Sequence, residues 1–170
     1  MIDIETWGTR STSAIIQIGA CYFDRDTGEI GDTFSVNIDY LVSTEPFTTD
    51  EATMQWWSEQ SQEAKDAVSA NGVSIATAIR DLHDFLDRDD VCIWSHATFD
   101  IPILLNAFHV LGLKFPIHYK KMRDIRTLMD LADHYGTKER EGIHHNALDD
   151  CIFQVGYCTE AFNKLKHGTP

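Results

Sequence analysis

The first 38 residues carry three successive β-strand patterns joined by short turns, and this feature restricts the fold more than any other. Residues 14–24 are rich in β-branched and aromatic side chains, and residues 32–38 alternate polar with apolar side chains, as a half-buried strand does. Residues 25–31 between them contain the Asp and Gly that turns favour. With a short strand at residues 1–5, the pattern predicts an antiparallel meander of three strands.

The remainder of the chain predicts helices around one buried strand. The apolar run at residues 91–95 (VCIWS) fits a buried central strand, and a further short strand is expected before the last helices. Amphipathic patterns and cap residues place helices at residues 50–58, 62–69, 74–86, 102–112, 126–135 and 146–165. This order predicts an α/β fold with a mixed sheet, in which three antiparallel strands are accompanied by parallel strands and flanked by helices. We expect residues 1–170 to form a single domain.

Acidic residues outnumber basic residues in this chain. It has 27 Asp and Glu against 14 Lys and Arg, which gives a formal net charge of -13. This balance argues against a protein that grips a long duplex through a broad basic face. No apolar run approaches the roughly 18 residues of a membrane span, and no secretion signal opens the chain. We therefore expect no association with a membrane.

The four cysteines form no metal or disulfide motif. Cys21, Cys92, Cys151 and Cys158 include no CxxC pair, and all lie among apolar neighbours. We therefore expect all four to be buried free thiols in a reducing compartment.

Two acidic residues stand two positions apart on the first strand. Because side chains alternate along a strand, Asp3 and Glu5 face one side of the sheet and Ile2 and Ile4 face the other. Two carboxylates on one face of an otherwise apolar strand fit a ligand site. The alternative is an edge strand whose polar face meets solvent.

A third carboxylate follows the buried central strand. Asp100 ends the sequence SHATFD directly after that strand, and α/β sheets bind ligands at the carboxyl ends of their strands. The alternative is a helix-capping Asp before Pro102.

The segment HHNALDD, residues 144–150, opens the last predicted helix. In a continuous helix His145 would face Asp149, four residues on, and not Asp150. A site that uses both His145 and Asp150 therefore requires non-helical backbone at His145, which the charged loop at residues 136–142 permits. The alternative is a solvated loop with Asp residues in the first helical turn.

In this order the motifs DIET, HATFD and HNALDD resemble the DEDD exonuclease superfamily, in its His-bearing DEDDh branch. The dipeptide WG at residues 7–8 and the segment MQWW at residues 54–57 resemble, more narrowly, the RNase AS-like 3′–5′ exoribonucleases, which also occur in phages. The resemblance implies a ribonuclease H-like fold, in agreement with the predicted order of elements. It also implies the cytoplasm of a bacterial or phage-infected cell.

The resemblance assigns roles to five residues: Asp3, Glu5, Asp100 and Asp150 bind metal, and His145 is the general base. Two carboxylates about 4 Å apart repel by roughly 4 kcal/mol at an effective dielectric of about 20, so such a cluster needs cations. Oxygen ligands favour Mg²⁺ or Mn²⁺, and two such ions can hold a scissile phosphate between them. His145 is suited to accept the proton of the attacking water.

The predicted activity is hydrolysis of single-stranded RNA from its 3′ end, with release of nucleoside 5′-monophosphates. The candidates for substrate contact lie beside the carboxylates: Thr6, Trp7, His96 and Phe99. Aromatic rings there can stack on terminal bases, although Phe99 is equally suited to the core. The basic residues between 114 and 126 either guide the nucleic-acid backbone or form a solvated surface.

Several alternatives stay open from the sequence. The same chemistry on DNA ends gives an exodeoxyribonuclease, and loss of chemistry gives a silent binding module of the same fold. A zinc site built from His96, His144 and His145 is a further alternative. Trp56 and Trp57 are adjacent and cannot share a helix face, so one is expected in the core and the other against substrate or a second subunit of a homodimer.

Overall fold

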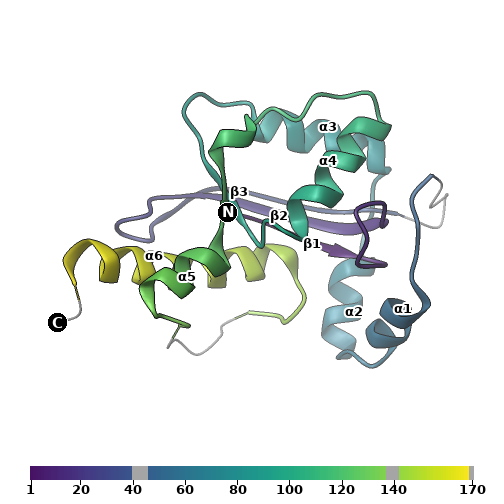
Figure 1. Cartoon of the computed structure of the whole chain (residues 1–170). Helices are drawn as coiled ribbons and strands as arrows, with labels where there is room; N and C mark the ends of the chain where they lie inside the picture. Colours follow the sequence, from purple (N-terminus) through teal and green to yellow (C-terminus); the bar gives the residue numbers. More distant parts are fainter. Residues whose placement is uncertain (40–45, 137–141, 169–170) are drawn as a thin grey trace.

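A computed structural model describes residues 1–39, 46–136 and 142–168, and it places a central sheet between layers of helices (Figure 1). The strands β1 (Ile2–Thr6), β2 (Ile15–Phe23) and β3 (Ile30–Asn37) form an antiparallel sheet in that order. The short strands β4 (Ile93–Ser95) and β5 (Met122–Asp124) pair in parallel, and β4 contacts β1. The predicted α/β class, with an antiparallel meander and a parallel pair flanked by helices, is confirmed. In the described residues the two ladders are separately hydrogen-bonded.

The helices divide between the two faces of the sheet (Figure 1). One face is covered by α3 (Ile75–Leu86) and α4 (Asp100–Val110), and the other by α5 (Ile125–Ala132) and α6 (Ala147–His167). Two shorter helices, α1 (Glu51–Ser58) and α2 (Gln62–Ser69), lie near one end of the sheet, and a 3₁₀ turn, η1 (Tyr119–Lys121), precedes β5. Side chains of Asp50, Ser74 and Asn146 cap α1, α3 and α6, as the sequence predicts.

Several helix boundaries differ from those that the sequence predicts, and two of the differences have a clear physical cause. Helix α4 begins at Asp100 and not at Pro102. Pro102 is the third helical residue, where the missing N–H has no partner to lose, so a proline there does not mark the start. Helix α5 ends at Ala132, before the predicted end at residue 135, because Asp133 adopts left-handed backbone with φ of 46°.

The pleat of β1 directs its side chains to different layers. Ile2 and Ile4 are buried in the hydrophobic core formed with α3 and α4. Strand β2 is the middle strand and is buried on both faces through most of its length, whereas β1 is covered by α6 on the face that carries Asp3. The acidic face of β1 is therefore directed at a helix and not at bulk solvent.

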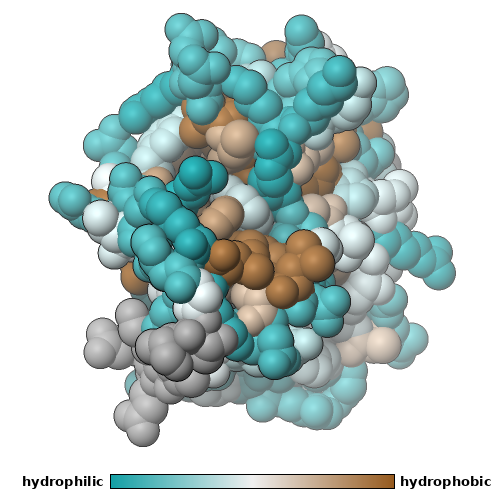
Figure 2. Space-filling view, turned by 60° about the vertical axis from the view of Figure 1, so that its left-hand side comes forward, coloured by the Kyte–Doolittle hydropathy of each residue, from teal (hydrophilic) through white to brown (hydrophobic). Residues whose placement is uncertain are grey.

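The surface is mainly polar. Figure 2 shows a face on which hydrophilic residues surround a compact apolar patch. Within the described residues, no helix combines the length and the apolar character that crossing a bilayer requires. Cys21, Cys151 and Cys158 are buried free thiols, and Cys92 is an exposed one, which corrects the expectation that all four are buried.

Candidate active site

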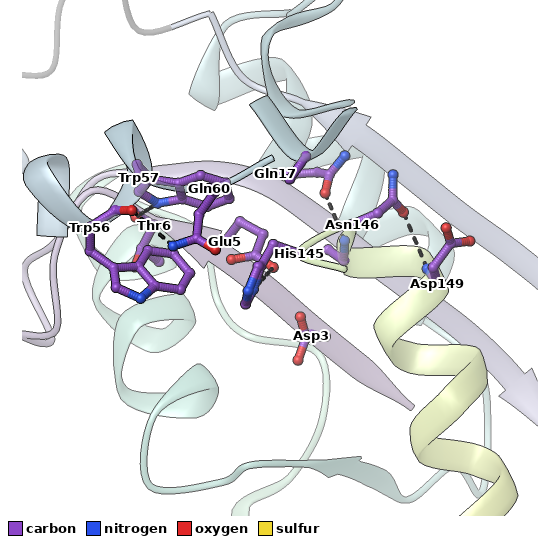
Figure 3. A network of polar contacts seen from close by, with 12 residues as sticks. Asp3, Glu5, Thr6, Gln17, Trp56, Trp57, Gln60, His145, Asn146 and Asp149 are labelled. Carbon is purple, nitrogen blue, oxygen red and sulfur yellow. Dashed lines mark hydrogen bonds and ion pairs between the residues drawn. The ribbon is translucent and has the colours of Figure 1, made fainter. Parts of the chain in front are cut away.

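Four carboxylates and one histidine from separate parts of the chain line a single cavity of about 490 Å³. Strand β1 supplies Asp3 and Glu5, the start of α4 supplies Asp100, α6 supplies Asp150, and the segment before α6 supplies His145. Figure 3 shows Asp3, Glu5 and His145 beside one another in front of β1. The structure therefore brings together all five residues that the sequence motifs single out.

The alternatives to a shared site do not describe these carboxylates. Asp3 is 8% exposed and Asp150 is 9% exposed, so neither is a solvated surface acid. Asp100 does not cap α4, because Phe99 occupies the N-cap position and Asp100 is the first helical residue. All three side chains are instead enclosed beside one another, which is costly unless something compensates for their charge.

The close packing of the start of α6 against β2 sets the geometry of the site. In the antiparallel register Asp3 lies opposite Gly19 and Glu5 lies opposite Gln17. Gln17 is 2% exposed, and its Oε1 accepts a hydrogen bond of 2.7 Å from the N–H of Ala147, the first residue of α6. A Cβ on Gly19 would overlap the backbone of Ala147, so only glycine allows this approach.

His145 adopts the non-helical backbone that its partnership with Asp150 requires. Its φ is 61°, in the left-handed region, and α6 begins two residues later with Asn146 as its N-cap. The Asp149 carboxylate accepts a hydrogen bond of 2.8 Å from the N–H of Ile143, which ties the preceding segment to the helix. Left-handed backbone at a non-glycine residue costs about 1–3 kcal/mol, so the surrounding structure must hold His145 in this conformation.

Two tryptophans hold the imidazole of His145. Its ring centroid lies 4.6 Å from that of Trp56 and 5.9 Å from that of Trp57, edge to face in both pairs. Trp57 is buried and donates a hydrogen bond of 3.0 Å from Nε1 to the carbonyl of Thr6, whereas Trp56 is 40% exposed (Figure 3). The predicted division between a core tryptophan and an exposed one is confirmed.

Asp100 carries the clearest electrostatic signature of the site. It is 1% exposed, and its pKa is raised well above the usual range by burial and then by the charge of Asp3. Backbone hydrogen bonds from His96 and Ile4 oppose this shift in part. Within the described residues its Oδ2 has no hydrogen-bond partner. A buried carboxylate oxygen of this kind, beside a second carboxylate, fits a ligand for a cation.

The ligand atoms fall into two clusters. One contains Asp3, His96 and Asp100, and the other contains Glu5, His145 and Asp150; within each, the atoms lie within 4.8 Å of one another. The carboxylate oxygens suit Mg²⁺ or Mn²⁺, so the residues fit divalent cations. In the part of the chain that the structure describes, no cluster unites His96, His144 and His145, so the geometry does not support the zinc alternative.

The predicted substrate contacts differ in where they lie. Phe99 lines the carboxylate cavity and a neighbouring pocket of about 450 Å³, while it also packs against the main core. His96 lines the carboxylate cavity, and Thr6 lines the neighbouring pocket. Trp7 lines neither; its ring packs 6.1 Å from that of Trp57 and against the core. The structure therefore does not place Trp7 where a terminal base would stack.

Sequence patterns missed two residues of the site. Gln154 is buried on α6, and its Nε2 donates a hydrogen bond of 2.7 Å to Oδ1 of Asp3. Gln17 binds the N–H at the start of α6. Of the basic residues between 114 and 126, Arg126 lines the carboxylate cavity. A glutamine inside the apolar run AIIQIGACYF was a readable signal for Gln17, because a buried amide needs hydrogen-bond partners.

Solved structures that share this fold are exonucleases. The nuclease domain of 3′hExo, a DEDDh family member bound to rAMP, has a TM-score of 0.62 at 14% identity, over 98% of this chain and 90% of that chain. S. pombe Pop2p with bound Mg²⁺ and Mn²⁺ has a TM-score of 0.63 at 15% identity, over 99% and 84%. A zinc-bound complex of E. coli ExoI with ssDNA has a TM-score of 0.66 at 15% identity, over 98% and 40%. The chain therefore shares the fold of these structures, one of which is described as a DEDDh family member.

The family follows from the sequence match. Residues 1–162 match the 3′-5′ exoribonuclease Rv2179c-like domain, and the chain belongs to this family. An exodeoxyribonuclease of enterobacteria phage T4 is 25% identical over 162 residues, which cover 76% of this chain and 70% of that protein. The resemblance carried by DIET, HATFD and HNALDD is confirmed, and the chain is a hydrolase of the 3′–5′ exonuclease class.

Gly19→Ala tests whether the close packing of α6 against Gly19 is needed for the geometry of the site. The added methyl must displace the start of α6, so we expect a loss of roughly 1–3 kcal/mol in unfolding free energy and a larger relative loss of exonuclease activity. Gly31→Ala, on β3, is the matched control, because its Cβ would meet Tyr22 at an ordinary 3.5 Å. Urea denaturation and activity measured well below the melting temperature check both variants. Equal losses of stability and activity in Gly19→Ala and Gly31→Ala would contradict a special role for the packing of α6 against Gly19.

Proposed function

We propose that this protein hydrolyses single-stranded RNA from its 3′ end and releases nucleoside 5′-monophosphates, with two divalent cations, Mg²⁺ or Mn²⁺, at the carboxylate site. The observation that carries the proposal is the pair of carboxylate–histidine clusters in one cavity. The exoribonuclease description of the family favours RNA. The Mg²⁺ and Mn²⁺ in Pop2p and the single-stranded DNA in ExoI support the cofactor and the single-stranded substrate.

In this mechanism Asp3, Glu5, Asp100 and Asp150 hold the cations. Bound there, divalent cations lower the pKa of water and stabilise negative charge on the departing 3′ oxygen. His145 accepts the proton of the attacking water as general base. Nδ1 of His145 lies 3.9 Å from Oε1 of Glu5, so the base stands beside the carboxylates that would hold the cations.

The protein also orients the reacting groups. Trp56 and Trp57 restrict the His145 ring on one side, and the left-handed backbone fixes the direction from which the imidazole enters the cavity. Gln154 fixes one oxygen of Asp3 by its hydrogen bond of 2.7 Å. A general base held in this way needs little reorganisation when the water attacks.

An exodeoxyribonuclease is the second candidate, and the phage T4 relative favours it. The two candidates share the same hydrolytic chemistry and differ at the 2′-hydroxyl, which a protein can contact through many groups. A silent binding module is the third candidate. The cavity lining argues against it, because a binding role alone gives no reason to enclose four carboxylates with a histidine.

Matched RNA and DNA oligonucleotides with Mn²⁺ or Mg²⁺ decide between the candidates. With a 5′ label, we expect the RNA to shorten one nucleotide at a time; with a 3′ label, we expect a labelled nucleoside 5′-monophosphate as the first product. Faster loss of DNA than of RNA would favour the exodeoxyribonuclease. Label released first from the 5′ end, or no product from either polymer with either metal, would overturn the proposal.

A homodimer and a location in the cytoplasm stay predictions that follow from the resemblance. The 40% exposure of Trp56 leaves part of its ring available to substrate or to a second subunit. Sedimentation equilibrium of the wild type and of Trp56→Ala measures the oligomeric state. A monomer in both samples at micromolar concentration would remove the dimer from the proposal.

A further inference from the structure

One side chain of opposite charge lies at the edge of the acidic cavity. Arg126 lines the cavity together with the four carboxylates, and in the described residues it is the only Lys or Arg of that lining. It is the second residue of α5, and its side chain is exposed. In a chain with a net charge of -13, a cation at this position requires an explanation.

Hydrogen bonds of the residues beside Arg126 fix the backbone at this position. The Asp124 carboxylate accepts hydrogen bonds from the N–H of Thr127 at 2.9 Å, its hydroxyl at 2.7 Å and the N–H of Ala97 at 3.0 Å. These bonds fix the start of α5 against the segment that leads from β4 to Asp100. Asp124, the acid nearest in sequence, is thus engaged as a helix cap, and Arg126 itself lines the cavity.

The charge of Arg126 acts at one end of the cavity. The pKa of His96 is lowered by burial and then by Arg126, and Arg126 also opposes the raised pKa of Asp100. Both residues belong to the cluster with Asp3, whereas His145 belongs to the cluster with Glu5 and Asp150. The hydrogen bond from Ala97 to Asp124 places the start of α5, and with it Arg126, beside the segment that carries His96 and Asp100. Arg126 therefore lies beside the cluster that does not contain the base.

This separation gives a direction to the bound strand. In an in-line displacement the attacking and leaving oxygens stand on opposite sides of the phosphorus. If His145 serves the attacking water, the leaving 3′ oxygen points toward Asp100, and the strand continues past it. The next phosphodiester on the 5′ side then approaches Arg126.

We propose that Arg126 binds the phosphodiester immediately 5′ of the scissile one and positions the strand for cleavage. The inference rests on the proposed function. A guanidinium suits this task, because its planar donors bind two phosphate oxygens at once and its charge persists at every working pH. A single cation at this position lets a strongly acidic protein hold the end of a polyanion locally.

Three substrates separate this contact from one at the scissile phosphate. The first is an RNA oligonucleotide, the second carries a neutral methylphosphonate only at the linkage 5′ of the scissile one, and the third is the p-nitrophenyl ester of uridine 5′-monophosphate, which has one phosphodiester. For Arg126→Ala we expect KM to rise tenfold or more on the first substrate, about 1.4 kcal/mol, with a smaller change in kcat. On the second and third substrates we expect no difference from the wild type.

Two further variants complete the experiment. Arg126→Lys keeps the charge and should recover part of the KM on the first substrate, whereas Arg80→Ala, an exposed arginine of α3, should behave as the wild type. An equal loss for Arg126→Ala on all three substrates would overturn the inference, because the third lacks the proposed phosphate. A wild type that hydrolyses none of them overturns the proposed function itself, so the two failures are distinguishable.

Discussion

Substitution of His145 by glycine is expected to lower kcat on RNA by roughly 10²–10⁴-fold, the usual contribution of a general base. Glycine is preferred to alanine for this test, because the φ of 61° at His145 strains any residue that carries a Cβ. His145→Gly therefore removes the imidazole while it keeps the backbone at the entry to α6. Added imidazole should restore part of kcat if the lost group is a proton acceptor.

His144→Ala is the matched control for this variant. His144 is the adjacent histidine, its side chain is exposed, and it does not line the carboxylate cavity. We expect its kcat to stay within about twofold of the wild type. Both variants should retain the rise in melting temperature caused by Mn²⁺, because the four carboxylates are unchanged. An unchanged kcat for His145→Gly would remove His145 from the mechanism.

Features of the site that depend on neighbouring residues could be predicted from the sequence, whereas contacts between residues far apart in the chain could not. The period of two on the first strand correctly predicted that Asp3 and Glu5 share a face, and the five-residue spacing correctly predicted non-helical backbone at His145. These are properties of neighbouring residues. The hydrogen bond from Gln154 to Asp3 instead joins residues 151 positions apart. No local periodicity encodes such a contact, because it exists only after α6 packs on the sheet.

The same distinction explains the errors at the edges of elements. Pro102 is a common marker of a helix start, but the geometry of the first turn tolerates proline at several positions. Trp7 follows Glu5 closely in sequence, yet the chain leaves the strand there and the ring packs against Trp57. Of the two aromatic neighbours of the predicted ligands, Phe99 lines the cavity and Trp7 does not, and contact of either with substrate stays a prediction.

Substitution of Asp100 by asparagine is expected to remove activity and to stabilise the metal-free protein at the same time. Loss of a carboxylate that holds a catalytic cation typically costs several kcal/mol of transition-state stabilisation, so we expect a fall of roughly 10³-fold in kcat/KM. Stability should move the other way. Asp100 is buried beside Asp3, and a neutral amide both removes their repulsion and supplies an N–H that can donate to the Asp3 carboxylate.

The difference in unfolding free energy between the two proteins should depend on pH in a definite direction. Burial and then Asp3 raise the pKa of Asp100 in the folded protein, so between the ordinary carboxyl pKa and this raised value the folded state binds more protons than the unfolded state. Unfolding free energy from this group is therefore retained at low pH and lost as the pH rises through the raised pKa. In EDTA, the advantage of Asp100→Asn over the wild type should grow as the pH rises from the ordinary carboxyl pKa through the raised pKa of Asp100.

Divalent metal should reverse which of the two proteins, the wild type or Asp100→Asn, has the higher melting temperature. Millimolar Mn²⁺ binds the folded wild type, offsets the repulsion between Asp100 and Asp3, and raises its melting temperature, whereas Asp100→Asn should gain much less. Asp124→Asn is not a suitable control, because it would disturb the cap of α5; Asp84→Asn, an exposed acid of α3, is suitable and should follow the wild type in both conditions. If the wild type in EDTA matches Asp100→Asn at pH 8 and neither responds to Mn²⁺, the enclosed carboxylates are not a cation site. If Asp100→Asn is instead the more stable protein in EDTA and only the wild type is stabilised by Mn²⁺, then Asp100 destabilises the metal-free protein and is retained for the metal that it binds.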